Sequence, residues 1–262
     1  MALAGSSPPR RAQSRPARDR LPRGHPRPLV TEAEAHAHSH TDVSGGWLRA
    51  AVFGAMDGLV TNTALVAGLG AAAPSGTVVL GGVAGLVAGA ISMALGEYTS
   101  VSTQNEQLDL EVSKERHELR VRPVEERAEL VEMWRSRGLD RALAEQVADQ
   151  LARDPEQELR EHARAELGLD PDEKPSPWTA SVSSFVCFAV GALIPLLPYL
   201  FGLDEVWAAV GVGGIGLFFA GVLSAGFTAR PWWSGGLRQL IMGLLAAGLT
   251  YLIGSWIGGP TS

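Results

Sequence analysis

Cysteine is almost absent from this sequence of 262 residues, in which Cys187 stands alone. A single cysteine excludes a disulfide framework within the chain and a metal site built from cysteine thiolates. Cys187 lies in an apolar stretch, where we expect it to act as a small buried hydrophobic residue. Any metal chemistry must therefore come from other residue types.

Charge is also absent from long stretches of the chain. Residues 50–96 carry one charged side chain, Asp57, and the runs 175–203, 206–229 and 239–262 carry none. Each run is close to the roughly 20 apolar residues that a helix needs to cross a bilayer, and continuous apolar runs favour helices over a barrel. We therefore expect an all-α, polytopic membrane protein. Its five spans are expected at about 48–71, 76–100, 178–201, 206–228 and 236–258.

The distribution of Lys and Arg predicts the orientation of these spans. Residues 1–46 form a Pro-, Arg- and His-rich tail without apolar periodicity, which we expect to be disordered and cytoplasmic. The loops at 71–77 and 202–206 contain no Lys or Arg and should face the opposite side. The expected location is a membrane, the inner membrane of a bacterial cell, with the N-terminus and residues 101–175 in the cytoplasm.

Three histidines alternate along the tail, at His36, His38 and His40. A His-rich tract can bind soft or borderline metals. The other interpretation is a solvated, low-complexity tail without metal, and the sequence leaves both open. The arginines of the tail could also contact anionic lipid at the inner leaflet.

Residues 101–175 hold 20 acidic and 12 basic side chains, and their pattern is helical. The first helix is expected to continue from the second span to residue 121. A second should begin at Pro123, since proline favours the first helical position, and should end at Gly138. Two more are predicted at 140–152 and 155–167, and four such helices can form a small antiparallel unit. The chain then divides into the tail 1–46, spans one and two at 47–100, the inserted helical unit and its linker at 101–175, and spans three to five at 176–262.

Carboxylates are spaced regularly in the inserted segment. Glu115 and Glu118 share one helical face, and Glu126 and Glu129 repeat the spacing beyond the Pro123 break. If these two helices pack together, four carboxylates converge and need a cation, and hard divalent metals prefer such oxygen ligands. The alternative is a solvated acidic surface, stabilised by pairs such as Lys114 with Glu118.

Asp57 is an acid within a predicted span. A charged Asp at the centre of a membrane helix costs about 2.5–3.5 kcal/mol, so such a residue indicates an ion or proton pathway by default. The other interpretation is an N-terminal helix cap near the membrane interface, because the predicted span begins only shortly before it.

Several function classes fit the sequence poorly. All six histidines lie outside the predicted spans and Asp57 is the one deeply placed Asp, which disfavours an intramembrane protease. The paired Glu-x-x-His motifs of di-iron bundles are absent, which disfavours a ferritin-like oxidase. A membrane-anchored metal sensor or scaffold, which binds cation without moving it, remains an alternative to a transporter.

Four segments carry a resemblance to a known family: FGAMDGLVTNTALVAGL, GLVAGAISMALGEYTSV, ALIPLLPY and FTARPWWSGGLRQLIMG. Together they resemble the vacuolar iron transporter family over about residues 47–258, as a bacterial-type member with a cytoplasmic metal-binding domain. The resemblance implies a homodimer that is not an enzyme and that exports Fe2+ or Mn2+ from the cytosol, in exchange for protons. It implies no prosthetic group and no nucleic-acid partner.

The same resemblance implies roles for particular residues. In the membrane it points to Asp57 for cation and proton, to Met93 as a soft ligand, and to Glu97 near the cytoplasmic end of the pathway. Plant vacuolar members have glycine at the position of Glu97. The family's Met and Glu ligands in the fourth helix correspond to His162 and Ala163. The metal ligands implied for the helical unit are Glu115, Glu118, Glu126, Glu129 and Glu166, with His162 as a nitrogen donor.

Overall fold

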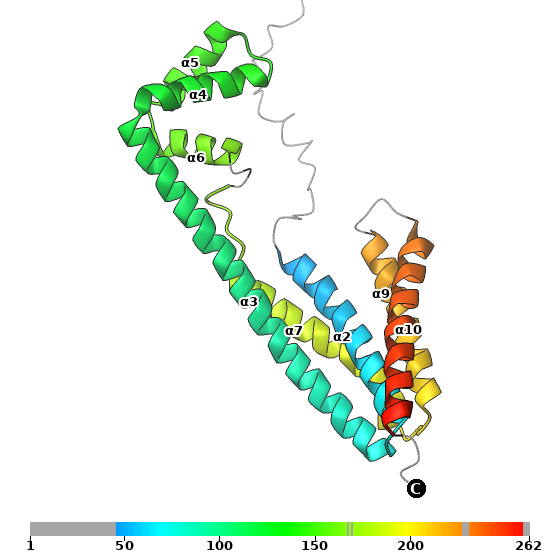
Figure 1. The fold of residues 1–262 in the computed structure, drawn as a ribbon. Coiled ribbons are helices and arrows are strands. Elements are labelled where there is room, and N and C mark those ends of the chain that lie inside the picture. The colour runs from blue at the N-terminus through cyan, green and yellow to red at the C-terminus, as the bar shows by residue number, and fades with distance from the viewer. Residues whose placement is uncertain (1–45, 167, 169, 227–230, 259–262) are drawn as a thin grey trace, which may run out of the picture. The chain divides into compact units, whose positions relative to one another are not determined.

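The computed structural model describes residues 46–166, 168, 170–226 and 231–258. The predicted tail, with His36, His38 and His40, lies outside the described residues. The described chain is helical between its turns (Figure 1). Its elements are α2 (Trp47–Gly70), α3 (Ser75–Val121), α4 (Pro123–Ser136), α5 (Arg141–Leu151), α6 (Pro155–Glu166), α7 (Pro177–Leu193), the 3-10 turn η2 (Ile194–Leu196), α8 (Leu197–Leu200), α9 (Val206–Gly226) and α10 (Trp232–Ile257).

Five stretches of helix in the described chain are long and apolar enough to cross a membrane. They are α2, α3, the Pro177–Leu200 stretch that comprises α7, η2 and α8, then α9 and α10. This confirms the predicted all-α membrane protein with five spans. Each helix begins within four residues of the expected start of its span, and four of the five end within two residues of the expected end, whereas α3 continues past residue 100 to Val121. Pro195 and Pro198 account for the change of helix type in the third span, since proline removes a backbone donor.

Helix α3 runs without a break for 47 residues. The sequence from Glu97 to Val121 contains no Gly or Pro, so nothing interrupts the helix at the end of its apolar half. At 1.5 Å per residue it is about 70 Å long, more than twice the hydrocarbon thickness of a bilayer. It ends where Pro123 follows, because the residue before a proline is disfavoured in the α conformation. One rigid element therefore links a membrane span to the acidic segment.

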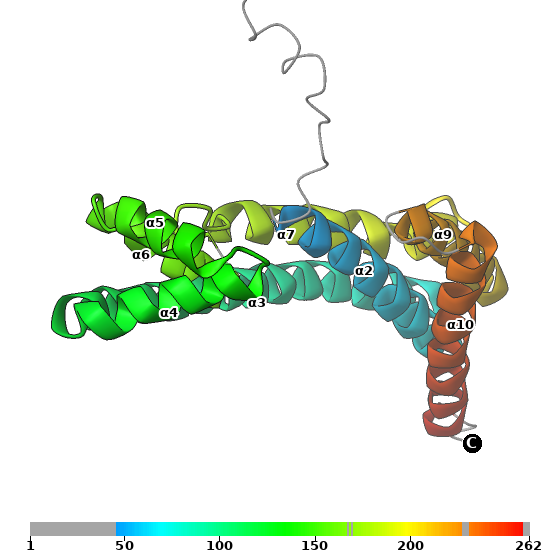
Figure 2. The same ribbon diagram turned by 90° about the horizontal axis from the view of Figure 1, so that it is seen from above.

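Helix α2 contacts α3, α7, α9 and α10, which makes it the central helix of the spans (Figures 1 and 2). Glycines permit the closest approaches. A Cβ atom at Gly191 of α7 would overlap the carbonyl oxygen of Ala55 in α2, and one at Gly254 of α10 would overlap that of Gly68. Membrane helices commonly associate through such small residues, since lipid supplies no hydrophobic drive between helices.

Helices α4 and α5 form a hairpin with an apolar core of its own. Asp140 caps α5 by accepting a hydrogen bond from the Leu143 backbone N–H at 2.9 Å, and Gly138 takes the positive φ that ends the preceding turn. The core contains Leu130, Val131, Ala144, Ala148 and Leu151, all from α4 and α5. Helix α6 packs against α3 instead. Side chains of α3, α4 and α6 also meet in the polar cluster described below.

The glycine contacts predict a stability difference between two alanine substitutions. Gly191→Ala should lower the midpoint of thermal unfolding in detergent, because its methyl group meets the α2 backbone and overpacking costs about 1–3 kcal/mol. Gly248→Ala is the matched control, since a Cβ there has no neighbour within 4 Å. It should leave the midpoint unchanged or raise it, because alanine is the better helix former. Equal midpoints for the two variants would contradict the described crossing of α2 and α7.

Candidate metal centre

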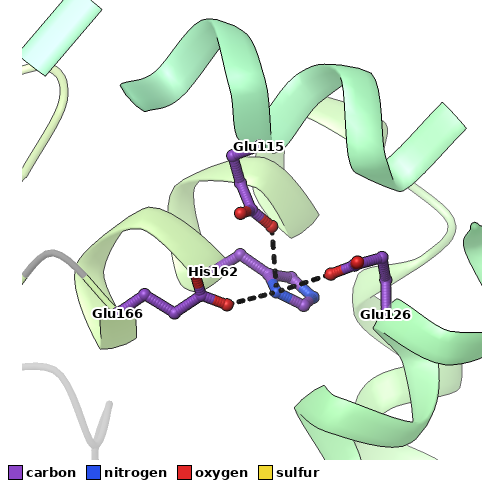
Figure 3. A group of neighbouring side chains, drawn as sticks. All are labelled: Glu115, Glu126, His162 and Glu166. Carbon is purple, nitrogen blue, oxygen red and sulfur yellow. Dashed lines mark ion pairs between the residues drawn. The ribbon is translucent and has the colours of Figure 1, made fainter. Parts of the chain in front are cut away.

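Four side chains from three helices converge at one point (Figure 3). They are Glu115 of α3, Glu126 of α4, and His162 and Glu166 of α6, and their ligand atoms all lie within 4.8 Å of one another. The Nδ1 atom of His162 is 3.2 Å from Glu115 Oε1, 3.6 Å from Glu166 Oε1 and 3.8 Å from Glu126 Oε2. We refer to these residues as the four-residue cluster.

The local sequence explains how the cluster assembles. The chain breaks at Arg122 between α3 and α4, and the side chains of Glu115 and Glu126 point to His162 from these two helices (Figure 3). Glu126 lies in the first turn of α4, where the helix dipole favours a carboxylate. His162 and Glu166 are four residues apart, which places them on one face of α6. Each helix thus contributes its ligands through ordinary helical periodicity.

The centre of the cluster is closed to solvent. The side chain of His162 is fully buried, and Glu115 and Glu126 are nearly so. Among the described residues, neither ring nitrogen of His162 has a hydrogen-bond partner, and neither does Oε1 of Glu115. Buried polar atoms without partners are costly and uncommon in folded proteins. One ring nitrogen of His162 and the Glu115 carboxylate can both donate electron pairs to a single divalent cation, which fits their lack of hydrogen-bond partners.

The electrostatics point the same way. Burial, and then the neighbouring charges of Glu166, Glu126, Glu118 and Glu129, raise the pKa of Glu115 to about 7. Burial also raises the pKa of Glu126, although His162 opposes this. A carboxyl group held near pH 7 exchanges readily between proton and metal. The cluster is therefore suited to bind cation in competition with protons.

Glu118 and Glu129 lie outside the cluster on the exposed surface of α3 and α4. They are close enough for their charges to raise the pKa of Glu115. The solvated-surface interpretation predicted an ion pair between Lys114 and Glu118. Among the described residues, Lys114 pairs with Glu111 instead, at 2.7 Å. The two residues surround the cluster with negative charge, and their role as direct ligands stays a prediction.

Arginines neutralise the acidic surface beside the cluster. Arg116 of α3 donates two hydrogen bonds to Glu156 of α6, at 2.7 and 3.0 Å. Arg164 bonds to Glu161 and to Asp170. Both interpretations of the carboxylate pattern thus apply, each to its own residues: the outer acids form exposed ion pairs, and the inner ones converge on His162.

The membrane residue Asp57 lies about three turns into α2, whose N-cap is Gly46. The alternative interpretation of Asp57 as an N-terminal cap is therefore wrong. Its carboxylate accepts a hydrogen bond from Thr61 Oγ1 at 3.3 Å, and the side chain is half-buried.

Met93 and Glu97 lie on α3. Met93 packs against Ala90, Phe188 and Ala192, so its side chain contributes to the contact between α3 and α7. Its role as a metal ligand stays a prediction. Glu97 is nearly buried and forms an ion pair with Arg49, at 2.9 Å between Glu97 Oε2 and Arg49 Nη2. The sequence analysis missed Arg49, because it precedes the charge-free run and its partner is 48 residues away.

Comparison with known proteins identifies the family. The model of the VIT family matches residues 48–255, which is most of the chain. The chain belongs to the VIT family. Vacuolar iron transporter 1 of Oryza sativa subsp. japonica is 35% identical over 234 residues, covering 85% of this chain and 92% of the relative. The vacuolar iron transporter of Acanthamoeba castellanii is 36% identical over 217 residues, covering 80% and 78%. Vacuolar iron transporter 1 of Arabidopsis thaliana is 32% identical over 235 residues, covering 86% and 93%.

Membership of the VIT family confirms the predicted class. The relatives carry transporter names, and this is a family of membrane transporters and not of enzymes. The five apolar helices of the described chain agree with a multi-pass membrane protein that transports metal ions. The VIT family match includes the whole of α3 to α6, so the four-residue cluster lies within the family's own extent.

The cluster predicts pH-dependent metal binding by the purified full-length protein. A metal must displace the proton of Glu115, so the affinity for Mn2+ should rise about tenfold between roughly pH 6 and pH 8. Glu115→Gln should weaken binding about tenfold or more and flatten this pH dependence. Isothermal titration calorimetry in buffers of different ionisation enthalpy measures both the affinity and the proton release.

Glu156→Gln is the matched control, since Glu156 is an exposed acid of α6 that pairs with Arg116. It should bind Mn2+ like the wild type. Equal affinity and equal proton release for Glu115→Gln and the wild type would show that the cluster is not the binding site.

Proposed function

We propose that this protein exports Fe2+ or Mn2+ from the cytosol, in exchange for protons. The observation that carries the proposal is the cluster of three carboxylates around the buried His162 imidazole, borne in part by a helix that continues into a membrane span. The names of the relatives, which are vacuolar iron transporters, support Fe2+ as one substrate. The metal is the transported substrate in this proposal and not a resident cofactor.

The donor set favours first-row divalent metals. Carboxylate oxygens alone suit Ca2+, Mg2+ and Mn2+, whereas an imidazole nitrogen adds preference for Fe2+ and later transition metals. His162 supplies that nitrogen beside Glu115, Glu126 and Glu166. The absence of a cysteine from the cluster argues against a preference for soft monovalent copper. A mixed site of this kind binds Fe2+ and Mn2+ and releases them when protons compete.

We further propose that α4, α5, α6 and the polar half of α3 form a cytoplasmic metal-binding domain. The excess of Lys and Arg in residues 101–175 over the short loops supports this side. The position of the cluster outside the apolar half of α3 supports a role in collecting cation before transport. A sensor or scaffold would use the cluster in the same way but would leave Asp57 without a role.

A strip of α2 supports a homodimer. Phe53 and Thr61 are exposed and Asp57 is half-buried, and these residues follow one another at intervals of four along the helix. In a single protomer this strip would face lipid, where a carboxylate is costly. A second copy that covers the strip would enclose Asp57 and Thr61 in a shared polar pathway near the two-fold axis.

The dimer can be tested with cysteine cross-linking in membranes. In a Cys187→Ala background, Thr61→Cys should form a covalent dimer with a short thiol-specific cross-linker, because the proposed axis brings the two α2 strips together. Leu249→Cys on the exposed face of α10 is the control and should remain monomeric. If Thr61→Cys yields only monomers with cross-linkers of several lengths, the result would count against the dimer.

Asp57 can be tested as the coupling residue. Asp57→Asn keeps the shape of the side chain and removes its titratable charge, so it should fold and dimerise but lose metal transport driven by a pH gradient. Met93→Ala should instead lower the affinity or shift the metal selectivity while the proton response remains. Uptake of Fe2+ and Mn2+ into proteoliposomes, with and without a pH gradient, measures both. Near-normal, pH-driven transport by Asp57→Asn would remove the central residue of the mechanism.

A further inference from the structure

Arg49 occupies an unfavourable place for a cation in an isolated helix. It lies in the first turn of α2, where the positive end of the helix dipole repels positive charge, and that turn contains no acid. Arg49 and Asp57 are the only charged residues of the whole helix. The local sequence therefore gives Arg49 no electrostatic partner, and its partner comes from another span.

That partner is Glu97 of α3, whose side chain is 9% exposed, while the side chain of Arg49 is 60% exposed. The carboxylate is therefore nearly buried, whereas the guanidinium that contacts it is largely exposed. One guanidinium nitrogen contacts one carboxylate oxygen, at 2.9 Å, so the contact is not the stronger bidentate form. Such a half-exposed pair contributes little stability and opens easily.

The surroundings hold Glu97 in place where three spans meet. Ala50 of α2, Val101 of α3 and Ala180 of α7 form a buried apolar cluster. Val101 lies one helical turn after Glu97, and Ala50 directly follows Arg49. One turn away, Ser181 donates a hydrogen bond to the Ala94 carbonyl oxygen at 2.8 Å. The rings of Tyr98 and Trp178 meet edge to face at 5.0 Å. A nearly buried carboxylate in such a packed site is more stable with a cation beside it.

We propose that Arg49 is a tethered counter-cation, which neutralises Glu97 until a divalent metal displaces it at this end of the spans. This inference rests on the proposed transport function and assigns a specificity-determining role within it. The guanidinium and the metal are alternatives for one carboxylate. A divalent ion replaces a single tethered charge with two, whereas Na+ or K+ gains nothing over the guanidinium already present. Arg49 therefore favours divalent over monovalent cations at Glu97.

The test compares the concentration dependence of Mn2+ uptake into proteoliposomes for matched variants. Arg49→Gln removes the competitor, so the KM should fall roughly two- to fivefold, the range expected for a half-exposed ion pair. Arg49→Lys retains a displaceable cation and should keep a KM close to that of the wild type. Glu97→Gln should raise the KM. Added 0.5 M KCl should inhibit Arg49→Gln more than the wild type at equal osmolarity.

The double variant Arg49→Gln with Glu97→Gln decides between explanations. If Arg49 acts through Glu97, the double variant should have the KM of Glu97→Gln alone. A general repulsion of cations by Arg49 predicts a lower KM in both backgrounds, which would overturn the proposal. A merely structural tie between α2 and α3 predicts less folded protein with an unchanged KM, which would also overturn it. The double variant contains no unpaired charge and should fold.

Failure of the proposed function gives a different result from failure of this inference. Wild-type protein that moves neither Mn2+ nor Fe2+ contradicts transport itself, and the tethered-cation role falls with it. Wild-type protein that transports Mn2+, with equal KM values for Arg49→Gln and the wild type, contradicts only the role of Arg49.

Discussion

The repulsion between three carboxylates that meet around the buried His162 ring is the constraint on which the arrangement of the polar helices depends. The apolar core of the described hairpin belongs to α4 and α5, whereas Glu115, Glu126 and Glu166 meet at its joint with α3 and α6. The ring of His162 lies between them, fully buried, and neither of its nitrogens has a hydrogen-bond partner in the described chain. A proton or a metal ion must offset that charge. In our proposal the bound metal ion therefore stabilises the packing of α3, α4 and α6 around the cluster.

Helix α3 connects this joint to the membrane. Glu115 and Glu97 lie 18 residues apart on one helix, which corresponds to about 27 Å at 1.5 Å per residue. A metal ion held at the cluster is thus too far from the spans to be shared with them. In our proposal the metal therefore binds at two sites, first at the cluster in the polar helices and then at the end of the spans, where Glu97 is paired with Arg49.

The sequence predicted those features that depend on local chemistry. Charge-free runs located the spans, and Pro123 and Gly138 located helix boundaries, because each acts through its own backbone. The two ExxE pairs predicted convergence, yet the described cluster takes only Glu115 and Glu126 and leaves Glu118 and Glu129 exposed. The angle at which two helices pack decides which glutamate of each pair faces the other helix. The spacing of residues in the sequence does not determine that angle. Arg49 was missed for a related reason, since contacts between residues 48 apart depend on the fold.

The central claim is that this member of the VIT family couples metal movement to protons. The most direct measurement records both fluxes together in sealed proteoliposomes of wild-type protein, with a metal-quenched dye, a pH-sensitive dye and Fe2+ kept reduced. The account predicts Fe2+ moving in one direction and protons in the other at a fixed ratio, with slower metal movement once an ionophore removes the pH gradient. Metal that binds but never crosses, or that crosses at a rate independent of the gradient, would contradict it.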